Sequence, residues 1–410
     1  MKDQPVYPAV PSERIVSLDL LRGIAVLGIL IMNVQSFAMI SAAYMNPAAW
    51  GDLTGLNKWV WIVTHVIASD KFLSIFSILF GAGLVLFTSK AIGKGHRAGP
   101  LHYRRIFWLL VFGMMHAYLI WYGDILVSYA LCGMLVFLFR KQRVKTLLIV
   151  GSAFFLVPAL MNLFAGATID IWPQEAIDEN MKSWQPALET INKEIAIRRS
   201  GWLGQMEFRV PQSVFMQTFV FFWFIFWRVM AMMLLGMALY KSGVLSAQKS
   251  KAFYARMAVL GILVGYSLSG WGVYENFRTG WELAYSRFFG SMFNYFGSLA
   301  SALGYVGIVM LLAKANIAGG FKRVMSAVGK MAFTNYILMS LLMMFTFYGN
   351  GLGLFSKLER GEQMLVVIGI WIIVVIISPV WLKHFRFGPL EWLWRVLTYW
   401  KYQPMKKAIR

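Results

Sequence analysis

The chain has 410 residues, of which 59% are hydrophobic and 14% charged, and it contains 17 tryptophans and 32 phenylalanines. A soluble fold of this length cannot bury so much apolar surface, so the composition excludes an ordinary soluble protein and indicates that lipid is the main solvent. The formal charge of +21 comes from short basic runs between apolar stretches. This distribution follows the positive-inside rule and excludes a nucleic-acid-binding surface.

The N-terminal arm, residues 1–14, is polar and proline-bearing. The apolar run that follows carries Asp19 and Arg22 and has no small-residue cleavage site, so we expect a retained helix and not a signal peptide. The single cysteine, Cys132, excludes a disulfide framework. His96 and His102 lie in a basic loop without neighbouring carboxylates, so no metal site is expected.

Ten stretches are apolar enough to cross a bilayer, which takes roughly 20 residues. They are 15–40, 59–88, 106–122, 125–139, 147–164, 215–240, 257–273, 289–312, 331–347 and 365–382. The second is too long for one straight span and is interrupted at Ser69, Asp70 and Lys71. We therefore expect 59–68 to lie on the outer surface or to re-enter there.

Cations occupy every alternate loop, and the loops between them are short or mixed in sign. The positive-inside rule then predicts an all-α integral membrane protein of about ten transmembrane helices in a single bundle, with both termini in the cytoplasm. Helices 1–5 fall in 15–165 and helices 6–10 in 213–383. Residues 166–212 are expected to form an extracytoplasmic helical cap or a plain loop, and 384–410 a basic amphipathic cytoplasmic tail.

Ionisable groups inside spans are costly, so each of them is a functional hypothesis. Asp19 and Arg22 share a helix face and form either a structural ion pair or a site in which Arg22, roughly 12 Å inside the membrane, meets a phosphate or carboxylate. Asn33 lies further along that face, near the outer leaflet. Arg228, near mid-bilayer, needs Asp19, a ligand anion or a carbonyl cluster as its partner.

His116 is predicted close to the midplane and Asp124 near the outer boundary, about 12 Å further along the helix. They touch only if the chain bends back at Gly123. His116 is then either a buried imidazole bonded to a neighbouring helix or a general base. His65 faces either an outer vestibule or the surface, and Asn294, Asn335 and Tyr336 are expected to join helices by hydrogen bonds.

Five stretches form a specific combination: RIVSLDLLRGIAVLGILIMN (14–33), KFLSIFSILFGAG (71–83), HAYLIWYGDILVSYALCG (116–133), MAFTNYILMS (331–340) and GPLEWLWRVLTY (388–399). Together they resemble the YeiB-like family of bacterial membrane proteins, whose function is obscure. The first stretch is also similar to that of the transmembrane acyltransferase superfamily, which includes cell-surface sugar O-acyltransferases and the lysosomal heparan glucosaminide N-acetyltransferase. This resemblance implies transfer of an acetyl group from cytoplasmic acetyl-CoA to a sugar on the far side.

Carried over residue by residue, Arg22 matches the first-helix arginine of the O-acyltransferase branch, but Asn33 stands where that branch has its catalytic histidine. The heparan branch also has an asparagine there and a histidine in the next loop, whereas residues 41–56 contain none. Acyl transfer would therefore need another base, and the sequence offers His116 or His65.

The interpretation is an acyl-CoA-dependent transmembrane acyltransferase of the bacterial inner membrane, with a sugar or similar envelope acceptor. Arg22, Arg104, Arg105 and Arg228 are expected to bind acyl-CoA. His116 is expected to act as general base with Asp124 beside it, and Asn33 as a donor to the oxyanion. A transporter of a small anionic metabolite and a non-catalytic membrane scaffold stay open as alternatives, as does a homo-oligomer.

Overall fold

The computed structural model describes residues 15–407, so the predicted arm 1–14 lies outside the described residues. Within 15–407 the regular structure is helical, apart from one isolated bridge between Phe385 and Lys406. The first half contains α1 (Val16–Ala38), α2 (Ala42–Met45), η2 (Pro47–Ala49), α3 (Gly55–Ala68), α4 (Lys71–Gly93), α5 (Ala98–Leu119), α6 (Leu126–Val136), η3 (Phe137–Lys141), α7 (Val144–Thr168), η4 (Ile169–Ile171), α8 (Gln174–Trp184) and α9 (Leu188–Arg198). The second half contains α10 (Met206–Phe215), the π-helix η5 (Met216–Ile225), α11 (Phe226–Lys241), α12 (Lys251–Arg278), the π-helix η6 (Ala284–Gly290), α13 (Ser291–Lys314), α14 (Gly319–Lys330), α15 (Ala332–Phe347), α16 (Arg360–His384) and α17 (Pro389–Tyr399).

Seven helical runs of the described chain are long and apolar enough to cross a membrane, and α14 with α15 makes an eighth if that pair, bent by 80°, is one span. The seven runs are Val16–Ala38, Gly55–Gly93, Val144–Ile171, Met206–Lys241, Lys251–Arg278, Ala284–Lys314 and Arg360–His384. The predicted ten also counted α5 and α6. With 11 residues, α6 is roughly 16 Å long and cannot by itself span about 30 Å of hydrocarbon.

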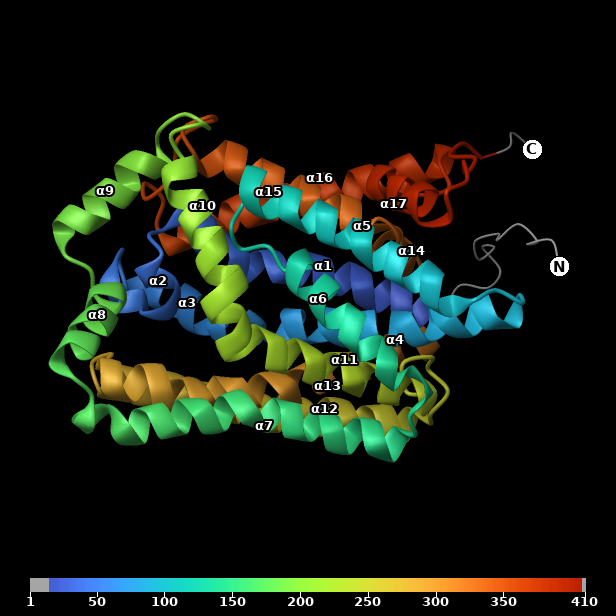
Figure 1. Cartoon of the computed structure of the whole chain (residues 1–410), viewed down its shortest axis with the longest axis horizontal. Helices are drawn as coiled ribbons and strands as arrows, with labels where there is room; N and C mark the ends of the chain where they lie inside the picture. The colour runs from blue at the N-terminus through green and yellow to red at the C-terminus, as the bar shows by residue number, and fades with distance from the viewer. Residues whose placement is uncertain (1–14, 408–410) are drawn as a thin grey trace.

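The long helices lie side by side along one axis, and the two ends of the bundle differ (Figure 1). The turns between α4 and α5, α6 and α7, and α11 and α12 lie at the same end as α17 and the beginning of α1. Helices α8 and α9, from the predicted cap segment, cover the opposite end, and α10 runs across the neighbouring helices. The basic loops that form these three turns therefore lie at one end of the molecule.

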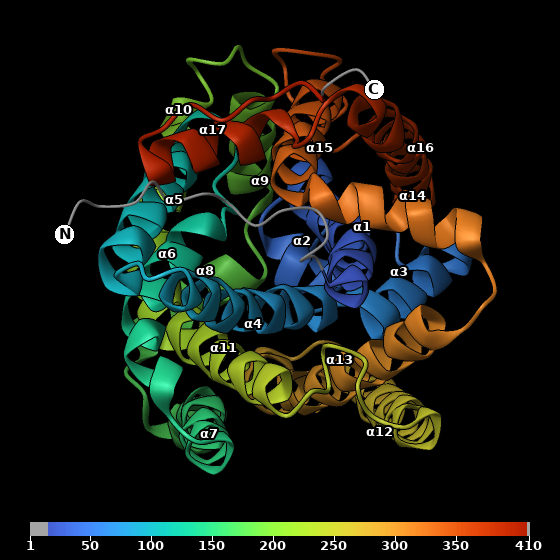
Figure 2. The same ribbon diagram turned by 90° about the vertical axis from the view of Figure 1, so that its right-hand side faces the viewer.

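Helix α1 is the centre of the bundle. Most of its side chains are buried, and α4, α13, α14, α15 and α16 pack around it. Figure 2 shows it from the end that carries α17. At the periphery the polarity is reversed, because large apolar side chains such as Leu160 of α7, Leu263 of α12 and Leu365 of α16 are exposed. An apolar outer surface around a core that contains polar groups is the arrangement expected in lipid.

The predicted interruption at Ser69 to Lys71 is present, since α3 ends at Ala68 and α4 begins at Lys71. Asp70 between them has φ of 62°, in the left-handed region. The two helices nevertheless form one helical run of 39 residues, Gly55–Gly93, which is not bent by more than 40°. Helix α3 therefore continues α4 toward the capped end and does not turn back as a hairpin.

Two glycines bring α14 against α1. A Cβ at Gly329 would overlap the carbonyl oxygen of Asp19, and one at Gly23 would overlap that of Met325. This contact places the break between α14 and α15 beside Asp19 and Arg22, two residues that line a cavity.

Candidate functional site

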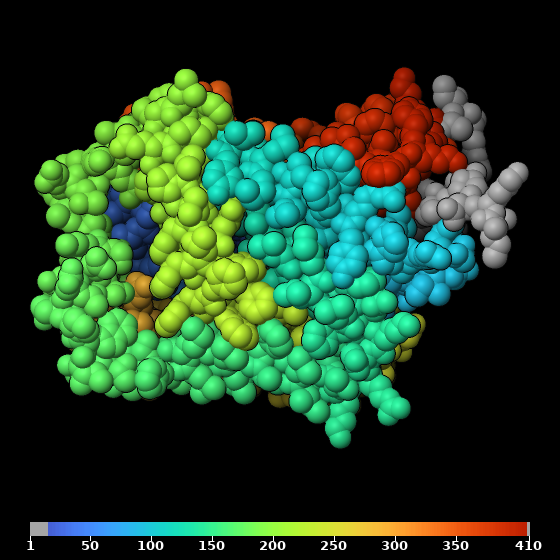
Figure 3. Space-filling view, in the orientation of Figure 1, coloured from blue at the N-terminus to red at the C-terminus, as the bar shows by residue number. Residues whose placement is uncertain are grey.

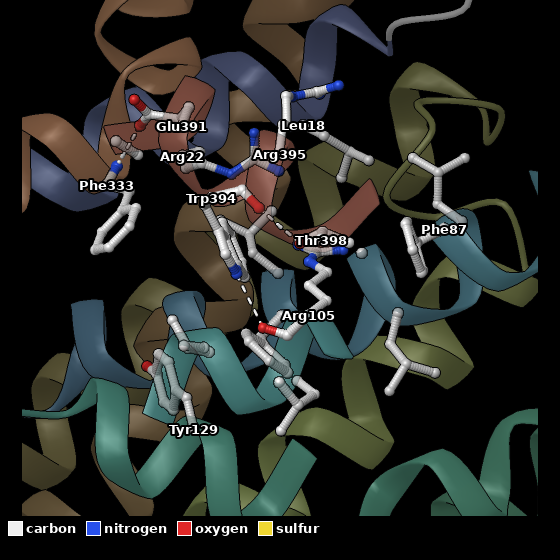
Figure 4. Close-up of a pocket in the computed structure, with 18 of the residues that line it drawn as sticks. Leu18, Arg22, Phe87, Arg105, Tyr129, Phe333, Glu391, Trp394, Arg395 and Thr398 are labelled. Carbon is white, nitrogen blue, oxygen red and sulfur yellow. Dashed lines mark hydrogen bonds between the residues drawn. The ribbon is translucent and has the colours of Figure 1, made fainter. Parts of the chain in front are cut away.

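A cavity of about 390 Å³ opens at the end of the bundle that carries α17. Its wall is built from α1, α4, α5, the first turns of α6 and α15, the end of α14, and α17 (Figure 4). The volume lies in the range of small-ligand sites. All five of the family-like sequence stretches supply residues to this wall, represented by Arg22, Phe80, Tyr129, Tyr336 and Trp394.

The mouth of the cavity is strongly basic. Its cationic side chains are Arg22, Lys90, Lys94, Arg105, Lys330 and Arg395, against the carboxylates of Asp19 and Glu391. Arg22 donates to Asp19 at 3.0 Å, so the predicted pair is formed. The charge of Arg105 is repelled by those of Arg22 and Arg395, and Figure 4 shows the three side chains around one space. Such a cluster suits an anion with several oxygens, because each guanidinium offers a fork of donors.

Helix α17 forms one side of this mouth, and two contacts hold it there. The indole of Trp394 donates to the Arg105 carbonyl at 2.9 Å. The Glu391 carboxylate accepts from the backbone N–H groups of Phe333 and Thr334, at 2.7 and 3.1 Å, and so caps the beginning of α15. Burial raises the pKa of Glu391, while these hydrogen bonds oppose that shift.

The residues of α17 were not among the predicted site residues, because its amphipathic pattern also fits a helix lying at the membrane surface. The sequence signal for them was the family-like stretch 388–399 itself.

Toward the interior, the cavity wall becomes apolar. It is lined there by Ile29, Leu79, Phe80, Leu126 and Tyr129, and it ends at Tyr336.

His116 and Asp124 form a buried pair next to this inner end. The imidazole Nδ1 and the carboxylate Oδ1 are 2.8 Å apart, and both side chains are 1% exposed. The second carboxylate oxygen accepts from the Val127 backbone N–H at 2.7 Å, at the beginning of α6. An ionised carboxylate only accepts, so Nδ1 of a neutral imidazole carries the hydrogen and Nε2 is left able to take a proton. Nε2 is buried and has no hydrogen-bond partner.

The pair forms because the chain reverses directly after α5. The backbone N–H of Trp121 donates to the His116 carbonyl at 2.9 Å, and α6 returns along α5. A Cβ at Gly113 would crowd the backbone of Val127, so the two helices approach closely there. The reversal spans the residues between Leu119 and Leu126, so Gly123 lies within it, as the predicted bend requires, and it brings the carboxylate back to the imidazole.

Side chains from the segment after α9 hold the end of α5. Two of them donate to the Leu119 carbonyl, which the helix leaves unpaired: Trp202 Nε1 at 2.9 Å and Arg209 Nη1 at 3.1 Å. Ser213 Oγ donates to the Ala117 carbonyl at 3.0 Å. Cationic donors at a helix C-terminus also interact favourably with its dipole.

The structure does not bring the other predicted site residues to the cavity. Asn33 is half-buried on α1 and does not line it. Arg104, next to Arg105, points instead to α17, donating to the Thr398 carbonyl at 3.2 Å and packing 4.2 Å from the Trp400 ring. His65 stacks on Trp61 in α3 and also lies away from the cavity.

Arg228 lies in a second polar cluster, which the sequence did not predict as a unit. Its Nη2 donates to Ser74 and Ser298, at 3.0 and 2.6 Å, and its guanidinium lies 4.7 Å from the Tyr295 ring. Serine hydroxyls and a ring are therefore its partners in place of Asp19 or a carbonyl cluster.

The same cluster contains Lys71, which is fully buried and donates to Asn294 Oδ1 at 2.6 Å, while the Asn294 amide donates to Asp70 at 3.2 Å. The sequence predicted Lys71 only as part of an interruption between spans, whereas the structure makes it a buried donor. Among the described residues, no group of three or more histidine, cysteine or acidic side chains is placed to hold a metal ion.

These features define a class: a helical membrane protein with a basic cavity at one end and a buried histidine–aspartate pair behind it. Residues 239–401 match the family described as "Protein of unknown function (DUF418)". "Uncharacterized protein YeiB" of Escherichia coli (strain K12) is 32% identical over 397 residues, 94% of this chain and 96% of that protein. "Uncharacterized protein YxaH" of Bacillus subtilis (strain 168) is 31% identical over 427 residues, 99% of each chain.

The chain therefore belongs to the YeiB family of unknown function, which confirms the resemblance drawn from the five sequence stretches. An "Uncharacterized 39.9 kDa protein in amylase 3'region" of Bacillus acidopullulyticus is 27% identical over 398 residues, 96% of each chain. No solved structure matches the chain.

Proposed function

We propose that this protein is a transmembrane acyltransferase that moves an acyl group, such as acetyl, from cytoplasmic acyl-CoA to a sugar or similar acceptor of the cell envelope. The observation that carries the proposal is the adjacency of two sites with complementary chemistry. A basic cavity with an apolar inner end stops at Tyr336, whose ring packs 5.0 Å from the imidazole of a buried His116–Asp124 pair.

The cavity suits the donor because an acyl-CoA is anionic at one end and largely uncharged along its thioester arm. Arg22, Arg105 and Arg395 would hold phosphate oxygens at the mouth. The apolar wall around Leu79 and Leu126 would surround the arm and its acyl group. Charge at the mouth would also raise the local concentration of the donor.

His116 supplies the proton transfer. Nδ1 is oriented by Asp124, so Nε2 can remove the proton of the acceptor hydroxyl or amine as its oxygen or nitrogen attacks the thioester carbonyl. The carbon–sulfur bond then breaks, and the CoA thiolate leaves and takes up that proton. General-base catalysis of this kind contributes about 10² to 10⁴ in rate.

In this proposal the protein lies in the inner membrane of a bacterium, the basic end of the bundle faces the cytoplasm, and both termini are cytoplasmic. The clustering of the basic turns at one end supports that orientation. The acceptor would approach from the capped end, where Figure 3 shows a hollow between α8, α9 and α10.

The test uses the full chain in lipid nanodiscs. Titration calorimetry should detect acetyl-CoA, with a dissociation constant that rises with salt because the contacts are to phosphate. Radiolabel from acetyl-CoA should then pass to envelope glycan fragments. Absence of binding at millimolar acetyl-CoA, together with solute-driven flux in liposomes, would replace the proposal by the transporter alternative. Absence of both would leave a scaffold.

A further inference from the structure

The cavity and the His116–Asp124 pair are separate compartments in this structure. The cavity wall includes Ile125, Leu126, Tyr129 and Tyr336, but neither His116 nor Asp124. Both side chains of the pair are 1% exposed. A ligand in the cavity therefore cannot touch the imidazole unless part of the wall moves.

Tyr336 belongs to both compartments. Its ring lines the inner end of the cavity and also packs on His116, with ring centroids 5.0 Å apart and planes tilted by 51°. The sequence predicted this tyrosine as a helix-joining residue. Its neighbour Asn335 has that role, since its amide donates to the Val328 carbonyl at 3.1 Å and to Ser378 at 2.9 Å.

The two nitrogens of the His116 imidazole differ in their surroundings. Asp124 occupies Nδ1, whereas Nε2 is buried without a hydrogen-bond partner. A buried polar atom without a partner costs free energy, so a fold that retains one is consistent with a partner that arrives later.

We propose that the Tyr336 side chain is a gate, and that its rotation joins the basic cavity to His116. The Tyr336 ring is the part of the wall assigned to this movement, because it both lines the cavity and contacts the imidazole. The gate is a property of the fold, while its use in acyl transfer rests on the proposed function. Tyr336 is thus a positioning residue that decides when His116 and a ligand meet.

Contacts between α15 and α17 connect the Tyr336 gate to the mouth of the cavity. Phe333, three residues before Tyr336 on the same face of α15, also lines the cavity, and its ring lies 5.7 Å from that of Trp394. Glu391 holds the first backbone N–H groups of α15 to α17. A ligand that fills the space between α17 and α15 therefore presses on the helix turn that carries the gate.

A closed gate would protect a reactive donor. If water and a thioester reached His116 together, the water could add to the thioester carbonyl and release the free acid and the CoA thiol. Keeping the imidazole apart until the cavity is filled limits this side reaction, as lids do in other enzymes.

The first experiment measures access to position 116 and needs no acyl transfer. In a Cys132→Ser background, His116→Cys places a thiol behind the gate, and its modification by a small methanethiosulfonate from the basic side gives a rate. Adding Tyr336→Ala should raise that rate at least tenfold, whereas Tyr336→Phe, which keeps the ring, should leave it within twofold. Tyr336→Leu, which fills more of the space, should give an intermediate rate if the alanine variant does not purify as a single species.

The control is native Cys132, which is buried in α6 and does not line the cavity. Its modification in Tyr336→Ala protein with His116 intact should stay slow. An unchanged rate at position 116, a rate in Tyr336→Phe as high as in Tyr336→Ala, or equal acceleration at both thiols would overturn the gate.

The second experiment follows acetyl-CoA in the absence of acceptor. With His116 intact, Tyr336→Ala should release free CoA at least fivefold faster than wild type, and Tyr336→Phe should match wild type. Faster modification at position 116 without passage of radiolabel from acetyl-CoA to glycan fragments would uphold the gate and remove the acyltransferase proposal, so the two failures are distinguishable.

Discussion

His116 and Asp124 stand eight residues apart in the chain, yet the imidazole Nδ1 and the carboxylate Oδ1 are 2.8 Å apart. A continuous helix would separate them by about 12 Å along its axis. The contact exists because α5 ends at Leu119 and α6 begins at Leu126, so the intervening residues fold the carboxylate back over the last turn of α5. An ionisable pair inside a membrane bundle is costly to maintain, which makes it the first target for substitution.

His116→Gln should lower acyl transfer at least about a hundredfold while acetyl-CoA binding stays near wild type, because the amide keeps the size but cannot take a proton. Asp124→Asn should be comparably inactive, since its amide can donate to Nδ1 and so place the hydrogen on Nε2. Transfer assays and calorimetry on the same preparations measure both effects. Full activity in the glutamine variant would dispose of the general base, and loss of folding in every variant would favour a structural pair.

The arginines of the mouth should differ sharply from Arg104, which precedes Arg105 on α5. Arg105→Gln and Arg22→Gln should each weaken acetyl-CoA binding about tenfold or more, because hydrogen bonds to charged groups are worth about 1.5 to 3 kcal/mol. Arg104→Gln should change binding less than threefold, since Arg104 does not line the cavity and its side chain is held by the Thr398 carbonyl and the Trp400 ring. Equal losses at Arg104 and Arg105 in calorimetry would contradict the assignment of the cavity as the donor site.

Arg209 should be needed for the geometry at the end of α5. Arg209→Met removes a buried donor to the Leu119 carbonyl and should destabilise the protein by about 1 to 3 kcal/mol. Trp202→Phe removes the other donor to that carbonyl, but from an exposed position, and should cost about 1 kcal/mol or less. Thermal unfolding in detergent measures both. A larger cost for Trp202→Phe would show that Arg209 does not hold this helix end.

The close contact between α1 and α14 predicts a difference between two glycines of one helix. Gly329→Ala would place a methyl group on the Asp19 carbonyl, and overpacking of this kind typically costs about 1 to 3 kcal/mol. Gly320→Ala meets no atom within 4 Å and should be neutral or slightly stabilising. Unfolding midpoints of the two variants provide the comparison, and equal midpoints would contradict the packing of α14 on α1.

Orientation in the membrane is testable with two exposed glycines that have open space around them, Gly201 after α9 and Gly320 in α14. In a Cys132→Ser background, Gly201→Cys should react with an impermeant maleimide added to intact cells, whereas Gly320→Cys should react only after permeabilisation. The reverse pattern would invert the proposed topology.

Local patterns in the sequence were sufficient for the class of structure. Apolar length and the alternation of cations predict crossing helices because they reflect the thickness of the bilayer and the charge bias of its two sides, which act on each segment separately. The same locality explains why the break at Ser69 to Lys71 and the Asp19–Arg22 pair were predictable: each involves residues within one helix turn or one helix end. The roles of His116, Asn33 and His65 in catalysis stay predictions.

Which residues meet at the cavity was decided only by the tertiary structure. Arg104 and Arg105 are equivalent in sequence, but successive residues point about 100° apart around a helix, and the packing of α17 determined which of them faces the cavity. Trp394 and Arg395 lie some 370 residues from Arg22, and their amphipathic pattern fits a membrane surface equally well. Tyr336 contacts His116 because α14 and α15 meet at an angle that packing against α1 sets. Sequence alone determines the segments and their polarity, because those depend on the solvent around each one; the site depends on helix rotation and on long-range contacts, which have no local signal.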